Sequence, residues 1–366
     1  MLDANGGRRT APPTTDDPQT RRRSLIAGLS VVVLALGLLT WSKYLPYAGN
    51  VPDVLGSSDP GASILTADGT DGAAPGPSLA AGWHFTVAYL AGVWKALLAG
   101  LVIAAGVQVL LPSGWLRCAV GSRGGVAGGV RGSLLGTLTL MCSCCAAPVA
   151  VALRKARSGM PAAVGFWLGN PALNPVVLIL LLAVLPWQWA ALRFVGGATV
   201  VAIGIALARS QERRAFRDGK EMGAGAPSAP YSVRPSAAEF LRTLGGLTVR
   251  LLPEFLAVVF VLGTFRSALF PLGGTSGGTA VLVLALVIAG LLLPIPTGGE
   301  IAVVAGILAA GLPAPAAGAL LVTLPVLSLP SLLMVRGAFP RRVLMGAAVT
   351  TAAVGLLAAV IAPVIV

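Results

Sequence analysis

The stretch Cys142-Ser143-Cys144-Cys145-Ala146-Ala147-Pro148 gathers three of the four cysteines of this 366-residue chain into four positions. It lies inside an uncharged run from Gly132 to Leu153. A single cysteine in such apolar surroundings is ordinarily a small packing residue. Three together are unusual, so the stretch predicts a buried site inside a hydrophobic protein.

The composition outside this stretch indicates a membrane protein. Hydrophobic residues make up 56% of the chain and charged residues 11%, whereas about a quarter of a soluble domain is charged. Uncharged runs of 18 or more residues recur, and each is long enough to cross a hydrocarbon core of ~30 Å. The chain also has 47 glycines and 27 prolines, which broken helices at transport sites use. We predict an all-α polytopic membrane protein.

The charge pattern excludes nucleic acid as a partner. The formal net charge of +13 comes from basic residues in short segments between apolar runs, which is typical of cytoplasmic loops. No basic patch alternates with aromatic residues. The expected partners are the lipid bilayer and a small-molecule substrate, and homo-oligomer formation stays open. The bias toward Ala, Gly and Arg favours a bacterial protein of the inner membrane.

The distribution of charge divides the chain into six segments. They are a disordered cytoplasmic tail at 1–23, an extra transmembrane helix at 24–42, an extracytoplasmic loop at 43–82, a first transmembrane repeat at 83–208, a cytoplasmic linker at 209–238 and a second transmembrane repeat at 239–366. The N-terminus is thus expected in the cytoplasm. Trp83, His84 and Tyr89 are expected as interfacial anchors at the outer end of the first repeat.

The cysteine stretch is expected near the tip of a re-entrant hairpin at 125–156. The tail and the linker are both basic, so an even number of crossings separates them. Four spans already lie between them, at 24–42, 88–111, 161–185 and 188–208. Residues 125–156 must then enter and leave on the same side. The alternative is that the uncharged run crosses the membrane once.

An internal repeat at an offset of 154 residues indicates two related halves. The aligned segments are 159–163 with 313–317 and 143–145 with 297–299. The loop at 154–157 is basic, whereas its counterpart at 309–311 is uncharged. Related sequence with opposite loop charge predicts inverted-topology repeats, each with a re-entrant hairpin and with a ligand site near the midplane. Chance matching of Ala-, Gly- and Pro-rich sequence is the alternative.

These residues resemble the predicted permease family of the YraQ and ArsP type. The matching segments are Cys142–Pro148, Ser158-Gly159, Pro171-Ala172-Leu173-Asn174-Pro175, Gly298–Ala302 and Leu329-Pro330. The resemblance covers roughly residues 85–360 and implies a permease, since studied members look like exporters of trivalent organoarsenicals. Two departures concern the substrate: Cys145 stands where the family has glycine, and the second motif has no cysteine.

The candidate substrate-binding residues lie at two hairpin tips and on the helices beside them. They are Cys142, Ser143, Cys144, Cys145, Pro148, Asn170, Asn174, Thr297, Gly298, Gly299, Glu300 and Ser328. We call Cys142–Pro148 the first tip and Pro296–Glu300 the second tip. Thiolates are preferred ligands of soft centres, so the three cysteines are candidate ligands of trivalent arsenic. Glu300 is either the carrier of a coupling proton or a carboxylate bonded to a half-helix N-terminus.

Together these features predict a permease that exports a small thiophilic solute, foremost trivalent organoarsenicals, by alternating access around a midplane site. No enzyme and no cofactor are expected. No Gly-rich phosphate-binding loop ends in Lys-Ser/Thr, so nucleotide hydrolysis is not indicated, and no catalytic triad or metal-protease motif appears. A transporter of a sulfur-containing anion or a metal species is one alternative. Another is a membrane thiol–disulfide oxidoreductase, because Cys142 and Cys145 fit Cys-x-x-Cys.

Overall fold

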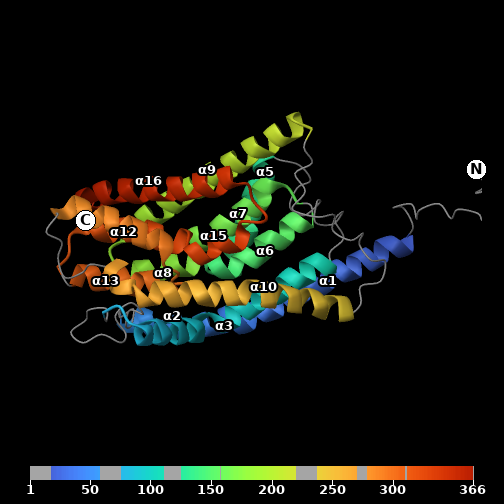
Figure 1. Ribbon diagram of the computed structural model, residues 1–366, viewed down its shortest axis with the longest axis horizontal. Coiled ribbons are helices and arrows are strands. Elements are labelled where there is room, and N and C mark those ends of the chain that lie inside the picture. Colours follow the sequence, from blue (N-terminus) through green and yellow to red (C-terminus); the bar gives the residue numbers. More distant parts are fainter. Residues whose placement is uncertain are drawn as a thin grey trace, which may run out of the picture.

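The computed structural model describes residues 18–57, 76–110, 125–156, 158–219, 237–269, 278–309 and 311–365. Within these ranges the chain forms helices and no strand (Figure 1). Seven helical segments are long and apolar enough to cross a membrane: Gly28–Ser57, Leu79–Val109, Met160–Val184, Trp187–Arg217, Ala237–Thr264, Ala314–Val335 and Arg341–Ile365. The predicted all-α polytopic fold is confirmed at this level.

The N-terminal span is longer than the sequence indicated. It consists of α1 (Pro18–Leu39), the π-helical segment η1 (Thr40–Tyr44) and α2 (Leu45–Ser57). The end of the expected tail at 1–23 and part of the expected loop at 43–82 are therefore helical, and much of both lies outside the described residues. The uncharged run ends at Lys43, but this side chain is buried and contacts Thr297 inside the protein. The charge therefore does not end the span.

The first half contains a helical hairpin packed against a third helix. Its helices are α3 (Leu79–Val109), α5 (Val126–Thr139), α6 (Ser143–Lys155), α7 (Met160–Ala172), α8 (Pro175–Val184) and α9 (Trp187–Arg217). A Cβ on Gly132 would collide with the carbonyl of Ala162, and one on Gly136 with that of Phe166. Both contacts step forward by four residues, so α5 and α7 run parallel. Consequently α6 returns the chain from the end of α5 to the start of α7.

The second half has helix boundaries that follow those of the first. Its helices are α10 (Ala237–Thr264), α11 (Arg266–Leu269), α12 (Gly278–Leu292), α13 (Gly299–Ala309), α14 (Ala314–Val326), α15 (Leu329–Val335) and α16 (Arg341–Ile365). The starts of α7, α8 and α9 at 160, 175 and 187 recur 154 residues later as the starts of α14, α15 and α16 at 314, 329 and 341. Figure 1 shows α5 and α6 toward one end of the bundle and α12 and α13 toward the other.

Two of the candidate spans are broken helices, and the sequence had indicated the first of them as one span at 161–185. One break separates α7 from α8 at Leu173-Asn174, and the other separates α14 from α15 at Leu327-Ser328. Each following helix has a proline in its first turn, Pro175 and Pro330. Proline lacks an N–H and clashes with a preceding helical turn, so the helix restarts there. At the first break the carbonyl of Pro171 accepts a hydrogen bond from Arg193, and Asn174 accepts from N–H groups of α8.

Candidate functional site

The cysteines of the first tip form one buried cluster. The Sγ atom of Cys142 lies 3.0 Å from that of Cys144 and 3.1 Å from that of Cys145, and all three sulfur atoms lie within 4.8 Å of one another. The three thiols are free, and none of the side chains is more than 4% exposed. Cys142 precedes α6, whereas Cys144 and Cys145 lie in its first helical turn. The cluster is thus assembled largely by helix geometry and only partly by an unwound tip.

The turn before this cysteine cluster is held by Asn170 of α7. Leu140 has a φ of 52°, a left-handed conformation that costs a non-glycine residue about 1–3 kcal/mol. The backbone N–H of Met141 donates to Asn170 Oδ1 over 2.7 Å, and Asn170 Nδ2 donates to the Thr139 hydroxyl. Asn170 therefore positions the first tip through both of its polar atoms.

Tyr89 lies against the cysteine cluster and not at a membrane interface as the sequence suggested. Its hydroxyl oxygen is 3.3 Å from Cys144 Sγ, and its ring packs between those of Phe85 and Phe255. The side chain is fully buried. Aromatic hydroxyls commonly pair when buried, but the sequence carried no signal that this partner is a thiol.

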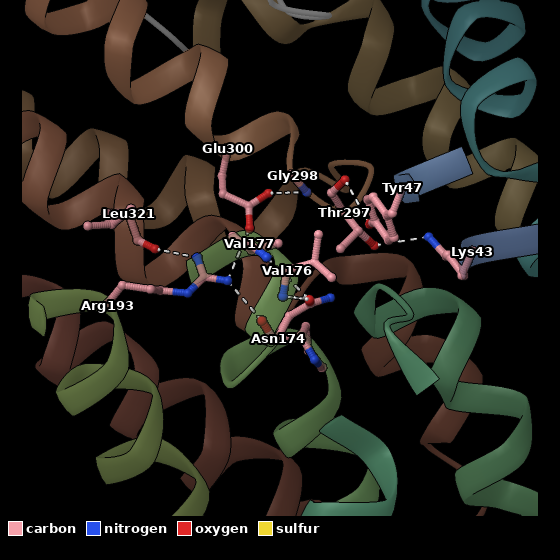
Figure 2. A network of polar contacts seen from close by, with 11 residues as sticks. Lys43, Tyr47, Asn174, Val176, Val177, Arg193, Thr297, Gly298, Glu300 and Leu321 are labelled. Carbon is pink, nitrogen blue, oxygen red and sulfur yellow. Dashed lines mark hydrogen bonds and ion pairs between the residues drawn. The ribbon is translucent and has the colours of Figure 1, made fainter. Parts of the chain in front are cut away.

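The second tip is a glycine turn tied to the N-terminal span. Gly298 has a φ of 92°, which glycine adopts without the Cβ penalty, and its N–H donates to Glu300 Oε2 over 2.9 Å. Lys43 Nζ donates to Thr297 Oγ1 over 3.3 Å, and the Tyr47 hydroxyl donates to the Thr297 carbonyl over 3.4 Å. Figure 2 shows these side chains meeting at the turn. Gly299 begins α13.

Glu300 is paired with Arg193 of α9 in a buried ion pair. Arg193 NH2 lies 3.0 Å from Glu300 Oε1, and the two side chains are only 1% and 2% exposed. The guanidinium also donates to the carbonyls of Pro171 and Leu321 over 2.8 and 2.9 Å (Figure 2). Arg193 was missed at the sequence level, although an ionisable residue inside an apolar span is itself a functional signal.

The remaining candidate residues lie at the helix breaks or inside α6. The Ser143 hydroxyl oxygen is 3.2 Å from that of Ser328, which caps α15. Asn174 Oδ1 accepts from the first two free N–H groups of α8, a standard N-cap. Pro148 lies buried within α6. Because α6 packs on α15 and α13 packs on α8, each tip contacts the broken span of the other half.

A family described as a predicted permease (ArsP_1) matches residues 78–364. The chain belongs to this predicted permease family. The permease is also 35% identical over 319 residues to the UPF0718 protein YraQ of Escherichia coli (strain K12), a match that covers 86% of this chain and 87% of that protein. No solved structure matches. The family and the seven candidate spans make the permease a multi-pass membrane transporter, and the resemblance stated from the motifs is confirmed.

The range matched by the family does not include the N-terminal span. The helices α1 and α2 and the segment η1 all precede residue 78, yet Lys43 and Tyr47 contact the second tip. Lys43 was not among the predicted site residues, because a lysine directly after an apolar run is typical of the end of a transmembrane helix. The permease therefore takes some of the polar groups around its tips from outside the matched range.

Proposed function

We propose that this permease exports a small thiophilic solute, with trivalent organoarsenicals as the leading candidates. The observation that carries the proposal is the cluster of three free thiols at the first tip. Soft centres prefer sulfur ligands, and three sulfur atoms within 4.8 Å of one another can share one such centre. The family resemblance supports the same solute class.

Binding requires ligand exchange and no change of oxidation state. Methylarsenite, CH3As(OH)2, exchanges its two hydroxyl groups for two cysteine sulfurs, and each thiol proton leaves with a hydroxyl group as water. The third thiol can displace one of the bound sulfurs, which takes up the proton that the third thiol releases. Solute can therefore move between sulfur pairs in small steps, and hydrolysis of both As–S bonds reverses the capture on the other side.

The transport mechanism follows from two inverted repeats with re-entrant hairpins. Three helix starts that recur at an offset of 154 residues support the repeat, and the location of the two hairpins at opposite ends of the bundle supports the inversion (Figure 1). In such folds substrates bind near the midplane beside discontinuous helices. Rocking of one half against the other would open the site alternately to each side.

The sidedness follows from the basic residues. The segment 1–23 ends in three arginines, and the linker at 209–238 is strongly basic, so both belong in the cytoplasm by the positive-inside rule. The first tip then enters from the cytoplasmic side of a bacterial inner membrane, and the second tip enters from the outer side. Export begins with capture by the thiols from the cytoplasm.

One distance favours a second candidate, a membrane thiol–disulfide oxidoreductase. Cys142 Sγ and Cys145 Sγ are 3.1 Å apart, so a small shift would bring them to the ~2.05 Å of a disulfide bond. That oxidation would release two electrons and two protons to a membrane quinone, which becomes the hydroquinone. A transporter of a sulfur-containing anion or a metal species stays the alternative within transport.

Methylarsenite resistance tests the proposal. Cells without their own arsenic exporters would express the wild type, each of Cys142→Ser, Cys144→Ser and Cys145→Ser, or Cys118→Ser as a control outside the cluster. We expect the wild type and Cys118→Ser to lower cellular arsenic and the cluster variants to lose this effect. Equal accumulation in all variants would remove the thiols from the mechanism. A Cys142–Cys145 disulfide that follows the redox state of the quinone pool would favour the oxidoreductase.

A further inference from the structure

Lys43 is a buried cation that has no carboxylate partner among the residues that the structure describes. Its side chain is 9% exposed, and no described Asp or Glu lies within ion-pair distance of it. The ammonium donates one hydrogen bond, to Thr297 Oγ1. It also lies 5.6 Å from the centre of the Tyr47 ring, a cation–π contact. A lysine ammonium has three donors, and an unpaired buried charge is strongly unfavourable. A negatively charged ligand would complete its surroundings.

The ammonium lies beside the second tip. Thr297, its hydrogen-bond partner, belongs to the second tip. The thiols of the cysteine cluster in the first tip are near enough to interact electrostatically with it, as is the Tyr47 hydroxyl. Figure 2 shows Lys43 reaching from the N-terminal span toward Thr297 and Tyr47. A solute bound to the thiols would thus lie within reach of a positive charge.

Other donors near the tips also lack acceptors. Within the described part of the chain, the buried Asn174 Nδ2 has no hydrogen-bond partner, and neither does the buried hydroxyl of Ser42, which precedes Lys43 in the sequence. The other buried cation beside the second tip, Arg193, is by contrast neutralised by Glu300. Lys43 therefore carries a positive charge near the tips that no described carboxylate neutralises, and Asn174 Nδ2 offers a further free donor.

The local backbone of the N-terminal span places Lys43 on its inner side. Residues Thr40–Tyr44 form a π-helical turn, which is wider than an α-helical turn and is frequent at functional sites. Leu39 and Lys43 are buried four residues apart, and Tyr47 follows after four more with a contact to the same tip. Residues spaced by four lie on the same face of a helix, so all three positions share the face that meets the second tip.

We propose that Lys43 binds an anionic group of the solute, so that the permease prefers thiophilic solutes that also carry a negative charge. This inference rests on the proposed function, because the cysteine cluster supplies the contact to the thiophilic centre. The preference would come from a helix outside the range that the family match covers. Specificity thus depends on two contacts: the cysteine sulfurs bind the thiophilic centre of the solute, and the Lys43 ammonium binds its anionic group.

Two probes with the same arsenic chemistry test this preference. Phenylarsine oxide is neutral, and 4-carboxyphenylarsine oxide carries a carboxylate; calorimetric titration of the purified full-length permease gives a Kd for each. We expect the carboxylated probe to bind the wild type more tightly. Lys43→Met should weaken its binding roughly ten- to a hundredfold, the range for losing a charge-assisted hydrogen bond, and leave the neutral probe unchanged. Lys43→Arg should retain most of the preference.

Lys95→Met is the matched control. Lys95 lies on α3 over the rings of Trp41 and Trp94, 5.8 Å from each, so its loss should not distinguish the probes. If Lys43→Met weakens the binding of both probes equally, the role of the lysine is structural. If it weakens the binding of neither probe, the lysine does not contribute to solute binding. Either result overturns the inference. Failure of the wild type to bind phenylarsine oxide would instead overturn the proposed function and the inference with it. The neutral probe also reports whether each variant has folded.

Discussion

Replacing Glu300 by leucine should destabilise the protein strongly, because it leaves Arg193 as a buried charge without a counter-ion. At the 3.0 Å separation of the pair and an effective dielectric constant of ~20, the attraction between the charges is about 5–6 kcal/mol. Removing one partner of a buried pair costs about 3–5 kcal/mol. The guanidinium keeps its bonds to the carbonyls of Pro171 and Leu321, so we expect the lower end of this range.

The free energy of unfolding can be measured by titrating the purified protein in mixed micelles with a denaturing detergent and following tryptophan fluorescence. The double variant Arg193→Met with Glu300→Leu should recover most of the loss, since apolar replacement of a whole buried pair is often neutral or stabilising. Glu254→Leu is the control, because Glu254 pairs with Arg336 over 2.9 Å but the side chains are 28% and 63% exposed. Such a pair contributes less than about 1 kcal/mol.

Two results would refute this reasoning. One is that Glu300→Leu lowers the free energy of unfolding no more than Glu254→Leu does, which would mean that water reaches the Arg193–Glu300 pair. The other is a double variant as unstable as the single one, which would mean that the carboxylate stabilises the second tip through its bond to Gly298 and not through charge pairing.

Two further predictions concern the packing and the topology. Gly132→Ala should lower the free energy of unfolding by about 1–3 kcal/mol in the same titration, because the new methyl group collides with the Ala162 carbonyl and over-packs the contact of α5 with α7. Gly37→Ala, which meets no atom within 4 Å, should be neutral or stabilising, and an equal loss would contradict the packing argument. Reporter fusions at residues 157 and 312 should place 157 in the cytoplasm and 312 outside. Two fusions on the same side would contradict the inverted repeat.

Features encoded by neighbouring residues could be predicted from the sequence. The apolar runs and the basic loops identified the membrane class, and the motifs identified the family. The grouping of the three sulfur atoms followed from cysteines within four residues, since Cys144 and Cys145 lie in the first turn of α6 and Cys142 directly precedes it. The offset of 154 residues was also visible in the sequence before the helix boundaries repeated it.

The partners of the polar groups depended on tertiary structure. Glu300 meets Arg193 across 107 positions, Tyr89 meets Cys144 across 55, and Lys43 meets Thr297 across 254. Periodicity tells which residues share a face of one helix but not which helix that face meets. The sequence by itself therefore determined the membrane class, the family and the cysteine cluster. Only the packing of helices from distant segments decided which charge each buried group encounters.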